Sequence, residues 1–304
     1  MKIGLVGLGR MGANMARRLA RGGVEVVAQD VSPVARTALA AELEVSVVDT
    51  LPALVGTLTA PRLVWLMVPS GDATETALEA LYPRLEPGDL VVDGGNAFYR
   101  DSITRARSLA DRSIAFVDAG VSGGTWGLAK GYMLMLGGTH EAVARVAPLA
   151  RVLAPAPDRG WLHCGPIGSG HFVKMVHNAI EYGMMQAYAE GFALLEAKEE
   201  FGLDVAAVAE QWRHGSVIRS WLLDLTAEAL AAKPDMRSIA PVVRDSGEGR
   251  WAAREAIELG VPAPVTQLAL AMRLATQGAN DYPARLLALM RNAFGGHAIE
   301  SKKQ

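Results

Sequence analysis

Short apolar runs alternate with helix-like stretches along the first half of the chain. The runs cover residues 2–6, 24–29, 63–68, 90–92, 114–117 and 132–136. Between them lie segments such as 13–21 and 73–81, which are long enough for crossover helices. This alternation is typical of βαβ units. We therefore predict an α/β protein whose residues 1–164 form a doubly wound parallel sheet domain.

The second half of the chain has a different pattern. Beyond Gly170, long stretches rich in Ala, Leu, Met and Glu are broken only by short Gly-Ser, Lys-Pro-Asp and Gly-Val-Pro segments. Apolar residues at helical spacing between such breaks indicate helices. We predict a mostly α-helical C-terminal domain over residues 165–304, joined to the first domain near the Pro-rich segment 155–157.

Length and charge agree with two domains and narrow the classes of partner. The 304 residues correspond to about two domains of ordinary size. The net charge is −2, so we expect neither nucleic acid nor anionic membrane as a partner, since both require a basic surface. We find no signal peptide and no apolar run of the ~18 residues expected of a membrane span. With a single cysteine, Cys164, no intrachain disulfide can form, and we expect a cytoplasmic protein.

A glycine-rich segment directly follows the first apolar run. Gly7-Leu8-Gly9-Arg10-Met11-Gly12 leads into a helix-like stretch, and the second run ends at Asp30, about 20 residues on. Such glycines let backbone N–H groups approach a pyrophosphate at a helix N-terminus. An acidic residue at Asp30 accepts hydrogen bonds from ribose hydroxyls and repels a 2′-phosphate. We predict a Rossmann-type domain that binds NAD in preference to NADP; the alternative is a tight turn without a ligand.

Three more apolar runs end in loops of small residues. The loops begin at Pro69, Asp93 and Asp118 and continue to residues 71, 96 and 124. The carboxyl ends of parallel strands lie at one edge of the sheet, where open α/β sheets bind ligands. One such loop alone is an ordinary turn, but four on one edge predict a cleft. The residues expected to join the cofactor site are Val68, Pro69, Ser70 and Asn96.

A polar stripe runs along a helix predicted from Gly170 to about residue 200. Lys174, His177, Asn178 and Glu181 are spaced so that they share one helix face. Their neighbours are almost all apolar, so we expect the rest of the helix surface to be buried. The stripe is then either a structural ion pair between Lys174 and Glu181 or an acid–base site, because burial helps a lysine lose its proton. A solvated polar face is the third alternative.

At this point the sequence resembles the 6-phosphogluconate dehydrogenases, within the β-hydroxyacid dehydrogenase superfamily. The segments GLGRMG, DGGN and GVSGG are shared with the whole superfamily, whereas HFVKMVHNAIEYG and RNAFGGH are specific to this branch. The resemblance covers nearly the whole chain. It implies an NAD(P)-dependent enzyme that oxidises and decarboxylates 6-phosphogluconate, a phosphorylated sugar acid, to ribulose 5-phosphate and CO2.

The resemblance also implies roles for individual residues. Lys174 would accept the proton of the substrate 3-hydroxyl and then polarise the ketone, and Glu181 would protonate the enediol. Tyr182 would contact the phosphate, and Arg291 and His297 in the tail would complete a neighbouring subunit's site, which implies a homodimer or homotetramer. The residues that would hold the sugar acid are Asn96, Ser122, Gly123, Gly124, His177 and Asn178.

The chain departs from the family pattern in its length, at Ala179, where the family usually has glycine, and in two segments. It resembles the short form, with a truncated helical domain. The sequence Gln29-Asp30-Val31 stands where the longer NADP enzymes carry an arginine, which supports NAD. The phosphate-binding lysine has no clear counterpart in the segment 244–251, so we expect Arg250 or Arg291 to take over part of its role.

Two other functions fit parts of the sequence. A dehydrogenase of 3-hydroxyisobutyrate or tartronate semialdehyde would share the glycine loops and Lys174, but would not require Glu181 or the pair Arg291 and His297. A non-catalytic NAD-sensing scaffold is a second alternative, because fold alone does not establish activity. The presence of both Lys174 and Glu181 disfavours it.

We expect no metal, since His163 and the other possible ligands do not form a group with the spacing of a metal site.

Overall fold

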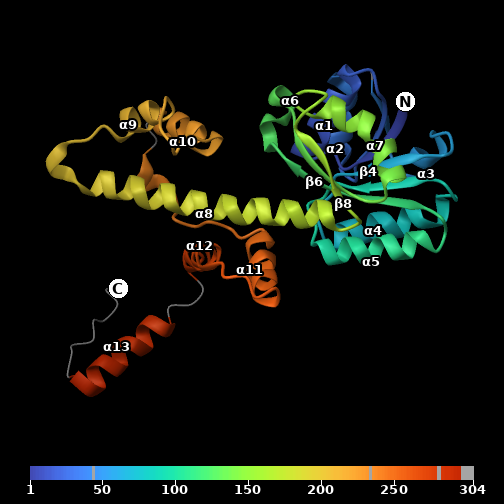
Figure 1. Ribbon diagram of the computed structural model, residues 1–304. Coiled ribbons are helices and arrows are strands. Elements are labelled where there is room, and N and C mark those ends of the chain that lie inside the picture. Colours follow the sequence, from blue (N-terminus) through green and yellow to red (C-terminus); the bar gives the residue numbers. More distant parts are fainter. Residues whose placement is uncertain (43–44, 233–234, 279–281, 296–304) are drawn as a thin grey trace. The chain divides into compact units, whose positions relative to one another are not determined.

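The computed structural model describes residues 1–42, 45–232, 235–278 and 282–295 (Figure 1). The chain forms two compact units, Met1–His177 and Asn178–Gln304, which we call the N-terminal unit and the C-terminal unit. The N-terminal unit is an α/β sheet domain and the C-terminal unit is helical, so the predicted fold class is confirmed.

The N-terminal unit contains one sheet of eight strands in the order β3-β2-β1-β4-β5-β6-β7-β8. All neighbouring pairs are parallel except β6 and β7, which run antiparallel. The strands are β1 (Lys2–Val6), β2 (Glu25–Gln29), β3 (Ser46–Val48), β4 (Leu63–Leu66), β5 (Leu90–Asp93), β6 (Ala115–Ser122), β7 (Met133–Gly137) and β8 (Trp161–Gly165). Each of the six predicted apolar runs overlaps a strand, whereas β3 and β8 were not predicted. Both lie at the edges of the sheet and have few buried residues, so they lack a clear apolar pattern.

The loop predicted from Asp118 onward begins five residues later than expected. Residues 118–122 continue β6, because they pair with residues 133–137 of β7 in antiparallel register. Asp118 and Gly120 therefore lie inside the sheet. Ser122 ends the strand, and Gly123 and Gly124 form the turn that follows.

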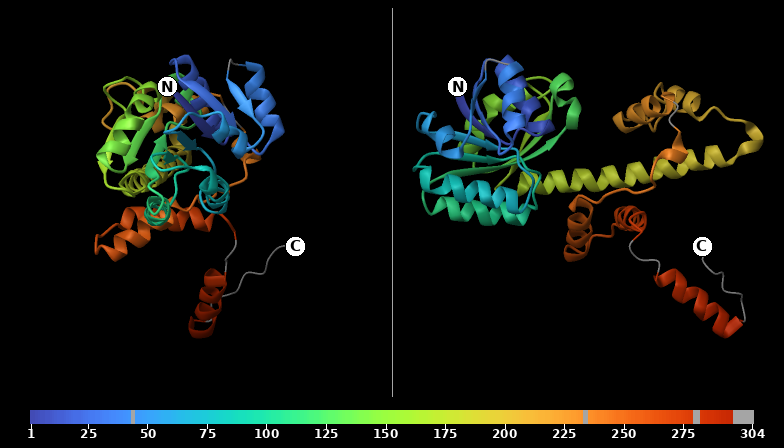
Figure 2. Two further views of the ribbon diagram at one scale, coloured as in Figure 1. Left: turned by 90° about the vertical axis from the view of Figure 1, so that its right-hand side faces the viewer. Right: turned by 180° about the vertical axis from the view of Figure 1, so that it is seen from behind.

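Helices cover both faces of this sheet (Figure 2). The helices are α1 (Arg10–Arg21), α2 (Pro33–Glu42), α3 (Leu51–Gly56), α4 (Asp72–Leu81), α5 (Tyr99–Ala110), α6 (Gly127–Lys130) and α7 (His140–Leu153). Their buried side chains form two apolar clusters. One contains Met15 and Leu19 of α1 with residues of α7, and the other contains Leu54 of α3 with residues of α4 and α5. This order of strands and helices places the carboxyl ends of β1, β2, β4 and β5 along one edge of the sheet.

Helix α8 (Ser169–Ala197) runs without a break across the division between the units. The other helices of the C-terminal unit are α9 (Val205–Trp212), α10 (Trp221–Ala231), α11 (Glu248–Glu258), α12 (Pro264–Ala275) and α13 (Tyr282–Gly295). In the described part of the chain, no helix combines the length and the apolar character that crossing a bilayer demands.

The expected burial of the apolar surface of α8 is wrong within this chain. Met175 and Ala179 are buried, but Val176, Ile180 and Met185 are exposed, with Ile180 60% exposed. The buried side of the helix instead includes the polar residues Lys174 and Asn178. Several apolar residues of α8 therefore lie on a surface that is exposed among the described residues.

Candidate active site

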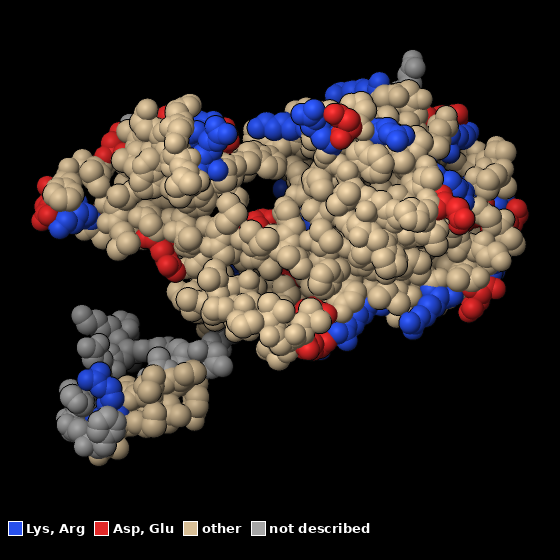
Figure 3. All heavy atoms as spheres, in the orientation of Figure 1, with Lys and Arg blue, Asp and Glu red and all other residues tan. Residues whose placement is uncertain are grey.

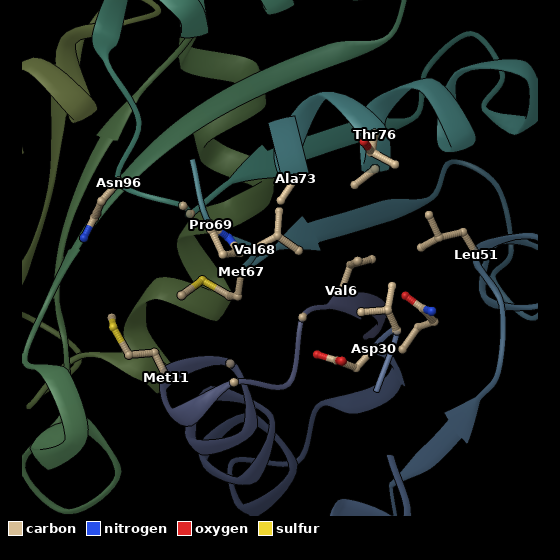
Figure 4. Close-up of a pocket in the computed structure, with 18 of the residues that line it drawn as sticks. Val6, Met11, Asp30, Leu51, Met67, Val68, Pro69, Ala73, Thr76 and Asn96 are labelled. Atoms are coloured by element: carbon tan, nitrogen blue, oxygen red, sulfur yellow. The ribbon is translucent and has the colours of Figure 1, made fainter. Parts of the chain in front are cut away.

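A cavity of about 620 Å³ opens at the carboxyl edge of the sheet in the N-terminal unit (Figure 4). This volume lies in the range of small-molecule and cofactor sites. Its walls come from the ends of β1, β2, β4 and β5 and from helices α1, α3 and α4, with Leu51 and Asn96 at opposite ends of the view. The predicted cofactor residues that line it are Gly7, Gly9, Arg10, Met11, Gly12, Asp30, Val68, Pro69 and Asn96. Leu8 instead belongs to the apolar core, and Ser70 is exposed on the loop after β4.

The glycine-rich loop has the backbone geometry of a pyrophosphate site. Gly7 adopts a φ of 95°, which only glycine tolerates readily. A Cβ at Gly12 would lie 1.9 Å from the Gly7 carbonyl oxygen, so glycine is required where α1 starts. A Cβ at Gly9 would meet nothing within 4 Å, so the cavity is open at this turn. The loop therefore fits a dinucleotide whose pyrophosphate lies at the N-terminus of α1.

Asp30 lies directly after β2 and has a second role that the sequence did not indicate. Its Oδ2 accepts a hydrogen bond from the Leu8 N–H at 2.6 Å, and its Oδ1 accepts one from the Ser32 N–H at 2.7 Å. The carboxylate therefore ties the glycine-rich loop to the end of β2 while it lines the cavity. The spacing along the chain predicted the ribose contact, but this loop contact depends on the fold.

Two helices contribute cavity residues that the sequence did not single out. Leu51 at the start of α3 and Thr76 in α4 both line the cavity (Figure 4). Neither belongs to a glycine-rich loop or carries a motif. Only the order of the strands in the sheet brings them to this edge.

Asn96 connects the cavity to the end of β6. It has a φ of 49°, a left-handed conformation that asparagine tolerates better than most residues. Its side chain donates to the Val121 carbonyl at 3.0 Å and accepts from the Val121 N–H at 2.8 Å. One residue further, Ser122 Oγ lies 3.5 Å from His177 Nε2. The N-terminal unit thus brings Asn96, Ser122 and His177 together.

Lys174 lies beside this strand. A Cβ at Gly120 would lie only 2.4 Å from Lys174 Cβ, so the glycine allows the lysine backbone to approach β6 closely. The lysine is 5% exposed. A buried amine packed against the polar backbone of a strand has the environment of a general base.

A second group of polar side chains lies within the C-terminal unit. Asn178 donates a hydrogen bond to Glu248 Oε2, and both side chains are buried. The Tyr182 hydroxyl donates to Asp245 Oδ1 at 3.2 Å and lies 3.2 Å from Ser246 Oγ. These contacts join α8 to the first residue of α11 and to the segment just before it. Glu181, the adjacent residue on α8, is half-buried.

Two arginines lie next to Tyr182. The Arg273 guanidinium lies 3.6 Å from the centroid of the tyrosine ring, a close cation–π contact. Arg250 forms an ion pair with Asp245. Burial raises the pKa of Asp245, but the hydrogen bonds from Arg250, Gly247 and Tyr182 outweigh it and hold this pKa below its ordinary value. Arg273 was not predicted, because no motif links α12 to Tyr182.

Only one of the two predicted tail residues lies in the described part of the chain. Arg291 lies on α13 and is exposed. His297 lies outside the described residues, so its predicted role is not tested.

Together, the fold and the site define a dinucleotide-binding protein with a helical second unit and a buried lysine in the unit that contains the cofactor cavity. Residues 2–161 match the NAD binding domain of 6-phosphogluconate dehydrogenase. Residues 170–281 match the 6-phosphogluconate dehydrogenase C-terminal domain. The chain belongs to the 6-phosphogluconate dehydrogenase family, as the resemblance predicted.

Relatives of this family occur in two lengths. The chain is 41% identical over 303 residues to the NAD(+)-dependent, decarboxylating 6-phosphogluconate dehydrogenase of Haloferax volcanii, with 99% of each chain covered. It is 35% identical over 278 residues to the NADP(+)-dependent, decarboxylating enzyme of Bacillus subtilis (strain 168), which covers 87% of this chain but 59% of that one. The chain therefore matches the first relative from end to end and the second only in part.

Solved structures agree with this assignment. The structure of Plasmodium falciparum 6-phosphogluconate dehydrogenase matches with a TM-score of 0.84 and 27% identity, covering 100% of this chain and 67% of that chain. A 3-hydroxyisobutyrate dehydrogenase from Salmonella typhimurium matches with a TM-score of 0.75 and 21% identity, covering 92% and 95%. The second match shows a shared fold only.

Proposed function

We propose that this protein oxidises and decarboxylates 6-phosphogluconate to ribulose 5-phosphate and CO2, with NAD as the hydride acceptor. The observation that carries the proposal is the buried Lys174, held against Gly120 of β6 in the unit that contains the dinucleotide cavity. Relatives that match the chain from end to end bear the name of this activity.

The cofactor, when bound, supplies the acceptor for the hydride that leaves C3 of the substrate. Lys174 Nζ accepts the proton of the 3-hydroxyl, so C3 is oxidised to a ketone. The protonated lysine then polarises the ketone oxygen while the bond from C2 to the carboxylate breaks and CO2 leaves. The electron pair of the broken bond and the lysine proton convert the ketone into an enediol. Glu181 then protonates the carbon that becomes C1 of ribulose 5-phosphate while Lys174 takes back the proton of the enediol hydroxyl. The side chains that orient the sugar acid are Asn96, Ser122, His177 and Asn178, with backbone contacts from Gly123 and Gly124.

The C-terminal unit offers cations for the substrate phosphate. Arg273 over the Tyr182 ring and Arg250 beside Asp245 place two guanidinium groups around the tyrosine that the family resemblance assigns to the phosphate. Guanidinium groups bind phosphate through paired hydrogen bonds. Arg250 and Arg273 therefore compensate for the lysine that this chain lacks, together with Arg291 from a second subunit.

Asp30 supports the choice of NAD. Its carboxylate lines the cavity and is fixed by two backbone N–H groups, so it cannot turn away from a ribose bound there. A 2′-phosphate beside this negative charge would be repelled. NADP is therefore the weaker cofactor.

The exposed apolar surface of the C-terminal unit supports a homodimer or homotetramer. Ile180 and Met185 on α8 are exposed, as are Leu268 and Met272 on α12. Large apolar side chains in such numbers mark an interface. In such an assembly the tail with Arg291 and His297 completes a neighbouring site.

We also propose that the protein is cytoplasmic and that its dinucleotide-binding domain ends at residue 164.

The test is an assay of the purified protein with 6-phosphogluconate and either NAD or NADP. Reduction is followed at 340 nm and CO2 release is recorded in the same reaction. Reduction with stoichiometric CO2, faster with NAD, is expected. Reduction without CO2, or activity only on short β-hydroxy acids, would assign the chain to a sister dehydrogenase.

A further inference from the structure

The first turn of α8 lies directly on β6 and β7, and glycines allow this close approach. A Cβ at Gly170 would lie 2.4 Å from the Met135 carbonyl oxygen and 2.5 Å from that of Asp118. A Cβ at Gly137 would lie 2.7 Å from the Gly170 nitrogen and 2.4 Å from Asp118 Oδ1. The backbone of the helix therefore packs directly on the backbone of the strands. At these glycines, no side chains of the described residues lie between them that could adjust to a small movement of the helix.

Asp118 is the charged group beneath this turn. Its side chain is 0% exposed, and it lies two residues before Gly120, on the same face of β6. One carboxylate oxygen accepts from the Gly168 N–H at 2.7 Å and the other from the His171 N–H at 2.8 Å. N–H groups at a helix start have no partner within the helix, and a negative charge there is favourable. Asp118 thus caps α8 from a neighbouring strand.

A second contact ties the same turn to α5. The His171 Nδ1 lies 2.7 Å from Ser102 Oγ, and both side chains are buried. The next residue on α8, Phe172, packs edge-to-face against Tyr99 of α5 with ring centroids 5.3 Å apart. The start of α8 is therefore held from β6 and from α5 at once, within the N-terminal unit.

We propose that Asp118, with the Ser102–His171 pair, is a positioning device for Lys174. Lys174 follows His171 by three residues and lies on the same side of the helix, so any shift of the first turn moves its Nζ. The nitrogen of a general base must lie within about 2.6–3.2 Å of the oxygen whose proton it accepts. A displacement of about 1 Å can lower the rate about 100-fold. This inference rests on the proposed function.

The experiment compares Asp118→Asn with a matched variant, Asp89→Asn. Asp89 is also fully buried and accepts two backbone N–H bonds, from Arg62 at 2.6 Å and Glu86 at 2.9 Å. It lies directly before β5, at the amino end of that strand, whereas the cavity lies at the carboxyl ends of the strands. Both variants are expected to lose stability. Only Asp118→Asn is expected to lose kcat, by roughly 10- to 100-fold, with the KM for NAD unchanged.

A deuterium isotope effect adds a readout that a purely structural role would not move. With substrate deuterated at C3, the effect on kcat is expected to rise in Asp118→Asn, because a misplaced base slows the step that breaks the C3–H bond. In Asp89→Asn it is expected to equal that of the wild type. A loss of kcat that is equal in the two variants, or an unchanged isotope effect in Asp118→Asn, would overturn the proposal.

If Asp118→Asn does not fold, the variant Ser102→Ala tests the positioning role instead. It removes only the hydroxyl from His171, and a fall in kcat of about 3- to 10-fold is expected from the loss of one buried hydrogen bond. A wild-type kcat in this variant would overturn the proposal. A wild-type protein that fails to turn over 6-phosphogluconate would instead refute the proposed function, and the positioning role with it.

Discussion

Replacing Gly120 by alanine tests how closely α8 must approach the sheet. The new Cβ would lie 2.4 Å from Lys174 Cβ and 2.9 Å from the Gly170 carbonyl oxygen. Carbon atoms in contact normally lie about 3.5–4.0 Å apart. Neither neighbour is the end of a flexible side chain, so the helix backbone itself must move by about 1 Å.

That movement is expected to lower both the stability of the protein and its kcat. Overpacking of a buried contact costs about 1–3 kcal/mol of the free energy of unfolding. A catalytic group displaced by about 1 Å lowers kcat about 100-fold. Because Gly120 does not line the dinucleotide cavity, the affinity for NAD is expected to stay within about twofold of the wild type.

The assay combines steady-state kinetics with urea denaturation and a fluorescence titration with NADH. Gly191→Ala in α8 is the control, because a Cβ at Gly191 would meet nothing within 4 Å. This control is expected to leave kcat unchanged and to stabilise the helix by about 0.5–1 kcal/mol. A Gly120→Ala protein with wild-type kcat and stability would refute the close packing of Lys174 on β6.

Three further predictions concern single side chains. Lys174→Met is expected to lower kcat by at least 10²- to 10⁴-fold while NADH still binds, which titration of the purified variant checks. Asp30→Ala is expected to weaken NAD binding by roughly 10- to 100-fold, since a charged hydrogen-bond acceptor is lost. The ratio of kcat/KM with NAD to kcat/KM with NADP is expected to fall in the same variant. Burial raises the pKa of the Cys164 thiol above its ordinary value, with the Asp118 charge as a further cause. Because the thiolate is the reactive form, its alkylation is expected to be slower than that of a model thiol at pH 8 and to rise with a midpoint at higher pH than that of the model thiol.

Each of these predictions has a result that contradicts it. Turnover by Lys174→Met at more than a tenth of the wild-type rate would exclude the lysine as the base. An unchanged cofactor ratio in Asp30→Ala would remove the charge argument for NAD. A Cys164 alkylation midpoint at or below that of a free thiol would contradict its burial, and the same midpoint in Asp118→Asn as in the wild type would remove the Asp118 contribution.

Charge on the surface agrees with the composition. Lys and Arg alternate with Asp and Glu on the visible face in Figure 3, and no broad region of one sign stands out there. On this face the charges are mixed, in agreement with the small net charge of −2.

Much of the site could be predicted from short segments of the sequence. The glycine loop needs a positive φ at Gly7 and close contact at Gly12, and only glycine meets both needs. The stripe from Lys174 to Glu181 follows from helical periodicity, and α8 spans it without a break. These features depend on residues close together in the chain.

Other features depend on partners far apart in the chain. Asp118 contacts α8 only because β6 continues past it to pair with β7, and no local pattern distinguishes that continuation from a loop. The contacts of Tyr182 with Asp245 and Arg273, and of Asp30 with Leu8, also join distant segments.

By itself, then, the sequence determined the class of fold, the cofactor loop, the acidic residue after β2 and the helix with its lysine. Local backbone requirements and hydrophobic periodicity are written in neighbouring residues. The tertiary structure alone decided that the start of α8 lies directly on strand backbone, that a buried carboxylate caps it, and that apolar side chains of α8 are exposed among the described residues. Those outcomes depend on strand order and on packing at a distance, which no short stretch of sequence encodes.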